Sequence, residues 1–243
     1  MAIALVNKTV GNSLSPTIPA TGAGNCLVVC VASTFFAAAS SISGITLGGA
    51  ADNFAQLVAP ETTTTGGNAA ALMWADPNCA GGQTAVVISG SNLFVGNGSG
   101  GVTVYEVSGL AATIGALLDQ SSAGVTNGTT WSSGATPVTG RAAEFWAGVV
   151  SSSSGTSTGP GAPWTNDLYT GNGGMSGYQV TSAAGAATFS GTQTAGAGAA
   201  LVATLQPGTP PVPSALPLNL DTTGVCQDQA QFQGPPLGSG YIR

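Results

Sequence analysis

The sequence contains no histidine and only three basic residues, Lys8, Arg141 and Arg243. Without histidine, a Ser-His-Asp triad or a Cys-His pair cannot form. Lys8 is then the one base that a Ser-Lys dyad could use, and it lies in the turn-like segment NKTVGN near the N-terminus. Three positive charges are also too few to follow a phosphate backbone, which normally takes several Lys and Arg contacts. The composition therefore excludes histidine-dependent nucleophilic catalysis and argues against a nucleic-acid partner.

Charge of either sign is scarce, because only nine Asp and Glu residues accompany the three cations. A free-standing cytoplasmic protein usually carries more surface charge for solubility. We therefore expect much of this surface to face neighbouring subunits or to be solvated by Ser, Thr and Asn.

Long hydrophobic segments are missing as well. No uninterrupted apolar run approaches the roughly 20 residues that span a bilayer. The N-terminal segment MAIALVNKTVGN lacks the basic region of a signal peptide, and its apolar part is too short. We expect no membrane partner, and a protein that is made in a cytoplasm and remains there until it is assembled or released.

Short apolar runs such as CLVVCV, TAVVIS, VTVYEV and FWAGVV recur between segments rich in Gly, Ser and Thr. A disordered chain has too few apolar residues to fold, which is not the case here. β-branched and aromatic runs bounded by turn-forming residues predict strands at about 2–6, 26–32, 42–47, 54–58, 70–74, 84–89, 101–107, 142–150, 177–181, 186–190 and 198–206. Helical spacing is found only in LAATIGALLDQ, enough for a turn or two. The pattern predicts an all-β sandwich over residues 1–207.

The C-terminal segment 208–243 differs from the rest of the chain in amino-acid composition. It begins with the proline-rich stretch that follows Leu205, where missing backbone donors prevent a sheet from continuing and favour extended conformation. The remainder keeps four large apolar residues that a pure linker does not need: Phe232, Leu237, Tyr241 and Ile242. We expect an extended arm that packs on the domain or on a neighbouring subunit, with a disordered tail as the alternative.

The four cysteines do not indicate a metal or redox site. In a strand, Cys26 and Cys30 point to the same face about 13 Å apart, well beyond the 7 Å or so that a disulfide allows between Cα atoms. Val28, Val29 and Val31 favour that strand, and zinc-type C-x2-C spacing is absent. Cys79 and Cys226 could bridge elsewhere, but a cytoplasmic origin favours thiols. We expect Cys26 and Cys30 to be buried as small hydrophobic residues.

Two acids, Glu106 and Glu144, lie inside strong strand patterns and are the candidates for a glycosidase-type carboxylate pair. Glu106 shares a face with Val102 and Val104, so we expect it to be partly buried, as a hydrogen-bonded carboxylate or in an ion pair with Arg141. We expect Glu144 to face solvent beside Trp146. Structural roles are favoured over catalytic ones for both.

Three further motifs have structural explanations that compete with functional ones. GNGSGG at 96–101 matches G-x-G-x-x-G, but a strand follows it instead of a helix, so we expect a hairpin turn. WADPN and TNDLYTGNGG contain oxygen ligands for calcium without EF-hand spacing, and Asx turns explain them equally well. The tryptophans at 131, 146 and 164 are suited to a sugar-stacking platform, but core or interface positions are favoured.

The segments GNSLSPTIPATGAGNCLVVCVAS, ISGITLGG, TAVVISGS, VTVYEVSGL and SGYQVTSAAGAATFSGTQTAGAGAALVATLQP together resemble a family of jelly-roll-like β-sandwich domains in tailed-bacteriophage virion proteins and related bacterial proteins. The resemblance covers about residues 1–207 and rests on strand and turn signatures. It implies an accessory structural component, such as a minor tail or capsid decoration protein, that is assembled in the bacterial host cytoplasm. It implies no catalytic residues.

We therefore expect a non-catalytic virion structural protein that contacts capsid or tail subunits and forms a homo-oligomer, with no cofactor, metal or catalytic residue. The candidate interface residues are Phe232, Leu237, Tyr241, Ile242, Trp146 and Trp164. One alternative is a carbohydrate-binding module for bacterial surfaces, which needs an exposed Trp or Tyr platform. The other is a glycan-cleaving enzyme, which needs facing carboxylates about 5 to 10 Å apart in a groove.

Overall fold

The computed structural model describes residues 2–34, 40–65, 68–96, 100–153, 157–169 and 173–209. The chain divides into a compact unit, Met1–Thr209, and a second unit, Pro210–Arg243. The first unit ends two residues after the boundary expected from the sequence. The four apolar residues of the expected arm, Phe232, Leu237, Tyr241 and Ile242, lie outside the described residues.

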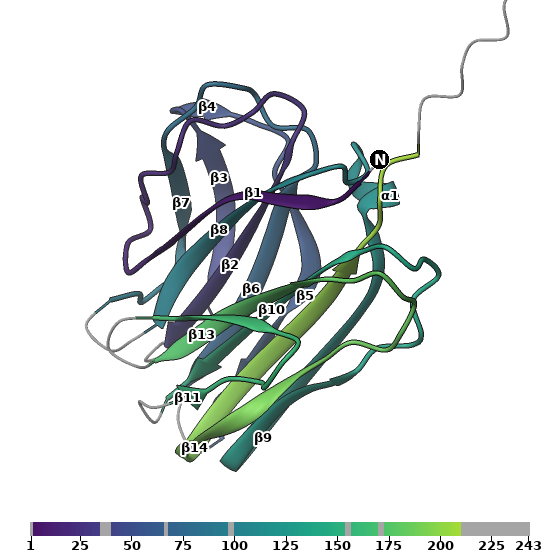
Figure 1. The fold of residues 1–243 in the computed structure, drawn as a ribbon. Helices are drawn as coiled ribbons and strands as arrows, with labels where there is room; N and C mark the ends of the chain where they lie inside the picture. Colours follow the sequence, from purple (N-terminus) through teal and green to yellow (C-terminus); the bar gives the residue numbers. More distant parts are fainter. Residues whose placement is uncertain are drawn as a thin grey trace, which may run out of the picture. The chain divides into compact units, whose positions relative to one another are not determined.

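Two large antiparallel sheets form the first unit (Figure 1). One has five strands in the order β1 (Ala4–Gly11), β8 (Gly100–Ser108), β2 (Cys26–Thr34), β6 (Ala69–Asp76) and β5 (Ala55–Thr63). The second contains β11 (Ser157–Thr158), β14 (Thr188–Leu205), β10 (Phe145–Ser152), β13 (Gly174–Val180) and β12 (Thr165–Leu168), with β9 (Leu118–Ala135) also paired to β14. The expected all-β antiparallel sandwich is confirmed.

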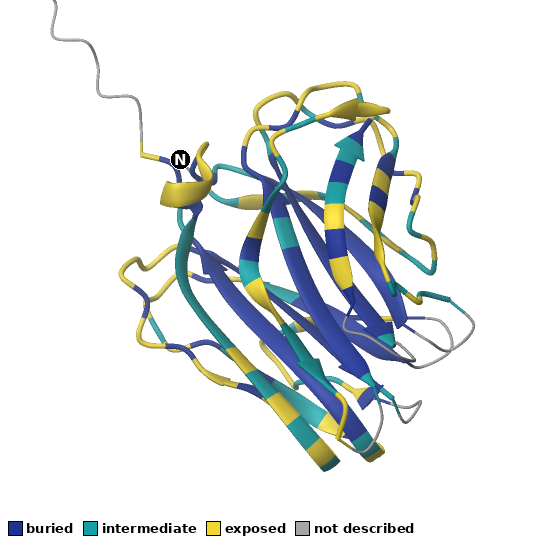
Figure 2. Cartoon of the chain, turned by 180° about the vertical axis from the view of Figure 1, so that it is seen from behind, coloured by how far each residue is buried: buried dark blue, intermediate teal, exposed yellow. Residues whose placement is uncertain are grey.

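The two large sheets pack face to face, with β10 and β14 against β2, β5 and β6, and β13 against β2 and β8. Every residue of β10 is buried, and so is all of β2 except its last residue. Because both faces of these central strands are covered, their sequences are continuous apolar runs instead of alternating patterns. Figure 2 shows this as dark blue strands in the middle of the unit, with exposed residues in the outer strands and the connecting loops.

A small third sheet covers the other face of the five-stranded sheet. It contains β4 (Ala50–Ala51), β3 (Ser41–Leu47) and β7 (Val86–Ser91). Its apolar side chains join those of β2, β6 and β8 in a second core. The five-stranded sheet is therefore the middle layer of this part of the unit, which explains why alternate side chains of β2 enter two different cores.

The outer face of the second sheet carries a third core, in which Trp131 and Phe189 are in ring contact. The paired strands β9 and β14 fold back so that Ser122 Oγ donates to the carbonyl oxygen of Ser133, 2.7 Å away. A Cβ on Gly124 would lie 2.4 Å from the carbonyl oxygen of Ser132, so this close approach requires glycine. Because β9 and β14 fold back onto the sheet, they bury the aromatic rings of Trp131 and Phe189, which an ordinary edge strand would expose.

Most predicted strands are confirmed, with bounds extended by a few residues. Segments 186–190 and 198–206 are parts of one long strand, β14, and β9 was missed because its Ser, Gly and Thr residues give no apolar pattern. The expected helix is one turn, α1 (Ile114–Leu117). At 96–101 the expected turn is supported by the hydrogen bond from Gly96 N–H to the carbonyl oxygen of Gly100 at 3.2 Å. It is not a hairpin between neighbouring strands, because the flanking β7 and β8 lie in different sheets. Residues 97–99 are outside the described part.

Candidate functional site

A buried chain of polar side chains joins the two large sheets at the side where β1 and β12 form their edges. Lys8 Nζ in β1 lies 2.5 Å from Asp167 Oδ1 in β12. Lys8 Nζ is also 5.4 Å from the centre of the Tyr178 ring, a cation–π contact. The Asp167 side chain is 5% exposed, compared with 36% for Lys8. The ion pair therefore closes the sandwich with its acid inside and its base near solvent.

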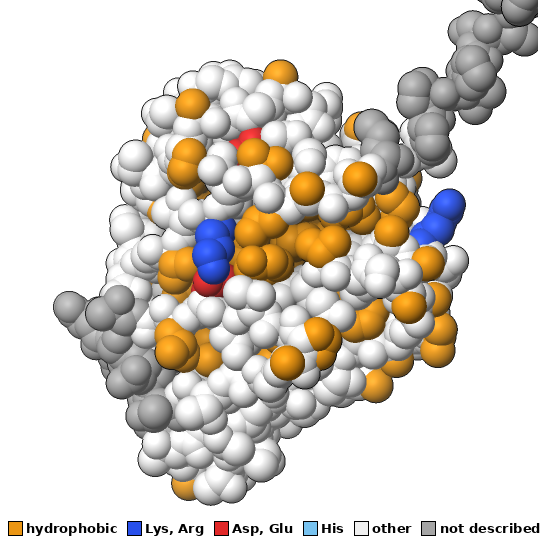
Figure 3. All heavy atoms as spheres, in the orientation of Figure 1, with side chains coloured by type: hydrophobic (Ala, Val, Ile, Leu, Met, Phe, Trp, Pro, Cys, Tyr) orange, Lys and Arg blue, Asp and Glu red, His pale blue; other side chains and the backbone are white. Residues whose placement is uncertain are grey.

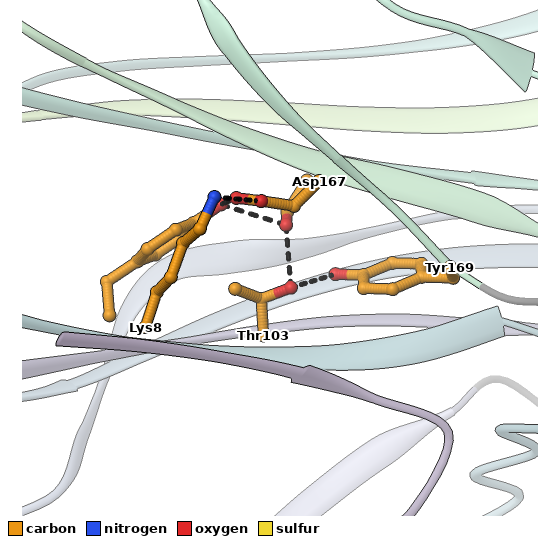
Figure 4. Close-up of polar contacts among 6 residues, drawn as sticks. Lys8, Thr103, Asp167 and Tyr169 are labelled. Atoms are coloured by element: carbon orange, nitrogen blue, oxygen red, sulfur yellow. Dashed lines mark hydrogen bonds and ion pairs between the residues drawn. The ribbon is translucent and has the colours of Figure 1, made fainter. Parts of the chain in front are cut away.

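The chain continues inward from Asp167 through hydroxyl groups (Figure 4). The Tyr105 hydroxyl lies 2.9 Å from both Asp167 Oδ2 and Ser176 Oγ, and its single proton can serve one of them at a time. Ser176 Oγ donates to Thr103 Oγ1 at 2.7 Å, and Thr103 Oγ1 is 3.3 Å from the Tyr169 hydroxyl. Burial raises the pKa of both tyrosines, which keeps the hydroxyls protonated and able to donate.

Sequence reasoning missed this network. Lys8 was expected in a turn, but it lies inside β1, opposite Tyr105 of β8. Its partner Asp167 is 159 positions away in the sequence. No local pattern identified the strand position of Lys8, because Asn7, Lys8 and Thr9 are three consecutive polar residues and do not alternate with apolar ones as a half-buried strand would. Because Lys8 is bound to Asp167, its ammonium group has a structural partner.

Glu106 is buried and hydrogen-bonded, which confirms one of the two expected alternatives. Its Oε1 accepts hydrogen bonds from the backbone N–H of Gly22 at 2.7 Å and from Asn25 Nδ2 at 2.6 Å. Its Oε2 accepts one from Asn7 Nδ2 at 2.9 Å. The other alternative, an ion pair with Arg141, is wrong, because Arg141 is exposed in the loop before β10. Amide donors satisfy this carboxylate, so it is a hydrogen-bonded structural group.

Glu144 is fully buried, which overturns the prediction that it faces solvent beside Trp146. Trp146 is 7% exposed, and its Nε1–H donates to Glu144 Oε2 at 2.9 Å. The other carboxylate oxygen, Oε1, has no hydrogen-bond partner. Burial raises the pKa of Glu144 to about 7; the nearby carboxylate of Asp119 acts in the same direction, and the Trp146 hydrogen bond opposes them.

We expect this shift to make stability depend on pH through Glu144. Its folded-state pKa of about 7 lies above the ordinary value of 4.5, so the folded state holds the proton more tightly. The associated stability is present below about pH 4.5 and is lost as pH rises to about 7. Glu144→Gln mimics the protonated acid and cannot titrate. Its Tm, measured by calorimetry, should match that of the wild type at pH 5 and exceed it at pH 8.

Asp119→Asn tests the cause of this shift, because it removes the charge that raises the pKa of Glu144. We expect the pH at which the wild type loses stability to move downward in this variant. A Tm difference between Glu144→Gln and wild type that is constant from pH 5 to pH 8 would contradict the prediction.

The cysteines lie where the strand pattern predicted. Cys26 and Cys30 are buried in β2 on the face that meets the second large sheet. Both are free thiols, as is Cys79. Burial raises the pKa of all three, for Cys79 to about 12, so they remain protonated at neutral pH. Cys26 and Cys30 are therefore packing residues, and Cys226 lies outside the described residues.

Three of the four tryptophans belong to the third core, and Trp74 packs against the second. Trp131 is 2% exposed and Trp146 is 7% exposed. Trp164 is partly buried, and its ring contacts those of Trp146 and Phe189. An open groove of about 500 Å³ lies over β9 and β14, but the Trp131 that lines it presents almost no surface. Trp131 and Trp146 therefore do not form the exposed platform that sugar stacking requires, and an interface role for Trp146 or Trp164 stays a prediction.

Within the described residues, no group of three or more Cys, Asp or Glu side chains is arranged to hold a metal ion. No helix in that part of the chain is long and apolar enough to cross a membrane. Comparisons with protein-family models, curated proteins and solved structures give no match to this chain.

Proposed function

We propose that this chain is a non-catalytic structural protein of a bacteriophage virion, which decorates the capsid or tail through contacts with other subunits. The proposal builds on the virion-type strand and turn signatures in the sequence. One structural observation carries it furthest: the described surface is nearly free of charge.

The surface carries so little charge partly because several of the charged side chains are buried. Four carboxylates of the described residues are buried: Asp76, Glu106, Glu144 and Asp167. Both basic residues of the described part, Lys8 and Arg141, are exposed, but Lys8 is paired with Asp167. Figure 3 shows the consequence on one face, where white and orange atoms dominate and charged side chains are isolated. A surface of this kind favours dense packing against neighbouring subunits over free solubility.

The side of the sandwich where Lys8 meets Asp167 supports the proposal further. Figure 3 shows hydrophobic side chains gathered beside a basic side chain, over the region of β1 and β13. The exposed apolar residues on this side are Val6 and Val10 in edge strand β1, Leu168 in edge strand β12, and Val180 at the end of β13. Among the described strands, β1 pairs only with β8, and β12 only with β13. Such edges offer backbone hydrogen bonds and apolar surface to another chain.

Light scattering tests self-association, by comparing the full-length protein with a chain that ends at Thr209. Truncation at this point keeps the hydrogen bond from Gly208 N–H to the carbonyl oxygen of Gly109. We expect the full-length protein to be a defined oligomer and the truncated chain, with unchanged circular dichroism, to be smaller. If both are folded monomers, assembly of identical subunits through the arm is ruled out.

Leu168→Lys in the full-length protein tests the edge separately. Leu168 is 63% exposed, so the substitution should not disturb folding, but a charge there disfavours apolar contact between subunits. The matched control is Val138→Lys, because Val138 is 68% exposed and belongs to the loop after β9. Equal oligomer mass in all three proteins would remove the β1–β12 side from the proposed interface.

A further inference from the structure

Two carboxylates, Asp52 and Asp76, meet where the small third sheet covers the end of β6. Asp76 is the last residue of β6, and Asp52 follows β4 directly. Both contact the turn that begins after β6: the backbone N–H of Asn78 donates to Asp76 Oδ1 at 3.1 Å, and that of Ala80 lies 3.5 Å from Asp52 Oδ2. The two carboxylates are neighbours, since Asp52 contributes to raising the pKa of Asp76. The carboxylate groups of Asp52 and Asp76 therefore lie close together at this turn.

Asp76, like Glu144, has a buried carboxylate oxygen without a hydrogen-bond donor among the described residues. Its exposure is 0%, yet Oδ2 has no hydrogen-bond partner. By contrast, buried Glu106 accepts three hydrogen bonds, and Asp167 has both Lys8 and Tyr105. A buried carboxylate oxygen without a donor is costly, and a missing ion is one explanation for such an atom.

The surroundings of this pair are negative. The pKa of Asp76 is raised to about 6, mainly by burial and also by Asp52, while the hydrogen bond from the Asn78 backbone N–H opposes the shift. The pKa of the adjacent Cys79 thiol is raised first by burial, then by Asp76, Glu106 and Asp52. Lys8 is paired with Asp167, and within the described part of the chain no basic side chain takes part in the interactions of Asp76. A cation bound between the two aspartates would balance this charge.

We propose that Asp52 and Asp76 bind a calcium ion. Calcium takes six to eight oxygen ligands and accepts mixtures of carboxylates, amide or backbone oxygens and water. Asp76 supplies the buried, unpartnered oxygen, and the partly exposed Asp52 supplies carboxylate oxygens on the solvent side. Zinc fits poorly, because the chain has no histidine and the Cys79 thiol is held protonated by a pKa of about 12.

Two carboxylates make a weak site, comparable with those that bind calcium in the 10⁻⁴ to 10⁻³ M range. At 10 mM calcium, a site of about 1 mM affinity raises the Tm of a chain of this size by about 3 to 6 °C. The binding residues all lie in the first unit, so this inference is independent of the proposed assembly role.

The test is calorimetry of the full-length protein at pH 7.5 after EDTA treatment and dialysis, in 10 mM CaCl₂ or in NaCl of equal ionic strength. We expect the Tm of the wild type to rise in calcium. The rise should disappear in Asp76→Asn and in Asp52→Asn. Asp119→Asn is the matched control, because it neutralises another acid that lies beside a buried carboxyl, Glu144, and it should keep the full rise.

Asp52→Asn keeps the test decisive if Asp76→Asn does not fold, because Asp52 is partly exposed. Calorimetric titration of wild-type protein with CaCl₂ should also show binding that Asp52→Asn abolishes. No calcium-dependent rise in wild-type Tm overturns the proposal, and so does a rise that persists undiminished in Asp52→Asn.

Discussion

Replacing Phe189 with alanine is expected to lower the free energy of unfolding by about 3 to 5 kcal/mol. The Phe189 ring is fully buried and contacts the rings of Trp131 and Trp164. It lies directly on the backbone of Gly148 in β10 and Gly177 in β13. Truncation leaves a cavity between the folded-back part of β14 and the second large sheet, and rigid sheet backbone cannot collapse into it. Denaturant unfolding followed by tryptophan fluorescence measures the loss.

Gly148→Ala provides the matched test of this packing. A Cβ at Gly148 would lie 2.4 Å from Phe189 Cγ, so the substitution alone is expected to cost about 1 to 3 kcal/mol through overpacking. In the Phe189→Ala background the new methyl group has space, and most of that cost should disappear. Costs that simply add in the double variant would show that the two residues are not in contact.

Replacing Lys8 with methionine is expected to cost about 2 kcal/mol, because it leaves the carboxylate of Asp167 without its countercharge. Asp167 is 5% exposed and cannot recover full hydration, although it keeps the hydrogen bond from Tyr105. The estimate is below the cost of breaking a fully buried pair, since Lys8 is 36% exposed and solvent can reach that side. Unfolding in urea is the appropriate measurement, because guanidinium chloride screens charge.

Replacing the acid of the same pair distinguishes the cost of an unpaired buried charge from the cost of lost packing. In Asp167→Asn the Lys8 ammonium can turn toward water, and the amide oxygen still accepts from Tyr105. We therefore expect Asp167→Asn to cost less than Lys8→Met. Equal or greater cost for Asp167→Asn would show that the stability of this edge depends on the acid itself instead of on leaving a buried charge unpaired.

These two sites explain how a chain with so few charges closes a large sandwich. At the β1–β12 side, one ion pair and a row of hydroxyls join the sheets. On the outer face of the second sheet, the folded-back β9 and β14 supply aromatic cover. Both devices use polar and aromatic groups internally, which leaves an uncharged outer surface available for the proposed contacts with other subunits.

The sequence by itself determined the class of the fold and the positions of its central strands. Cys26, Cys30 and the valines of β2 form a continuous apolar run, because that strand is covered on both faces. Such runs can be recognised locally, since the burial of a whole strand requires every residue in it to be small or apolar. The interior position of the two cysteines followed from the same pattern.

Only the tertiary structure decided how the polar residues pair. Glu106 binds amides from β1 and from the loop before β2, while Glu144 is enclosed by Trp146 and Asp119. Long-range contacts also decided the course of β9, whose Ser, Gly and Thr residues form a strand because β14 lies beside them. A carboxylate or a glycine has no strong local preference among these environments. Its partner is set by strands far away in the sequence, so local pattern could not identify it.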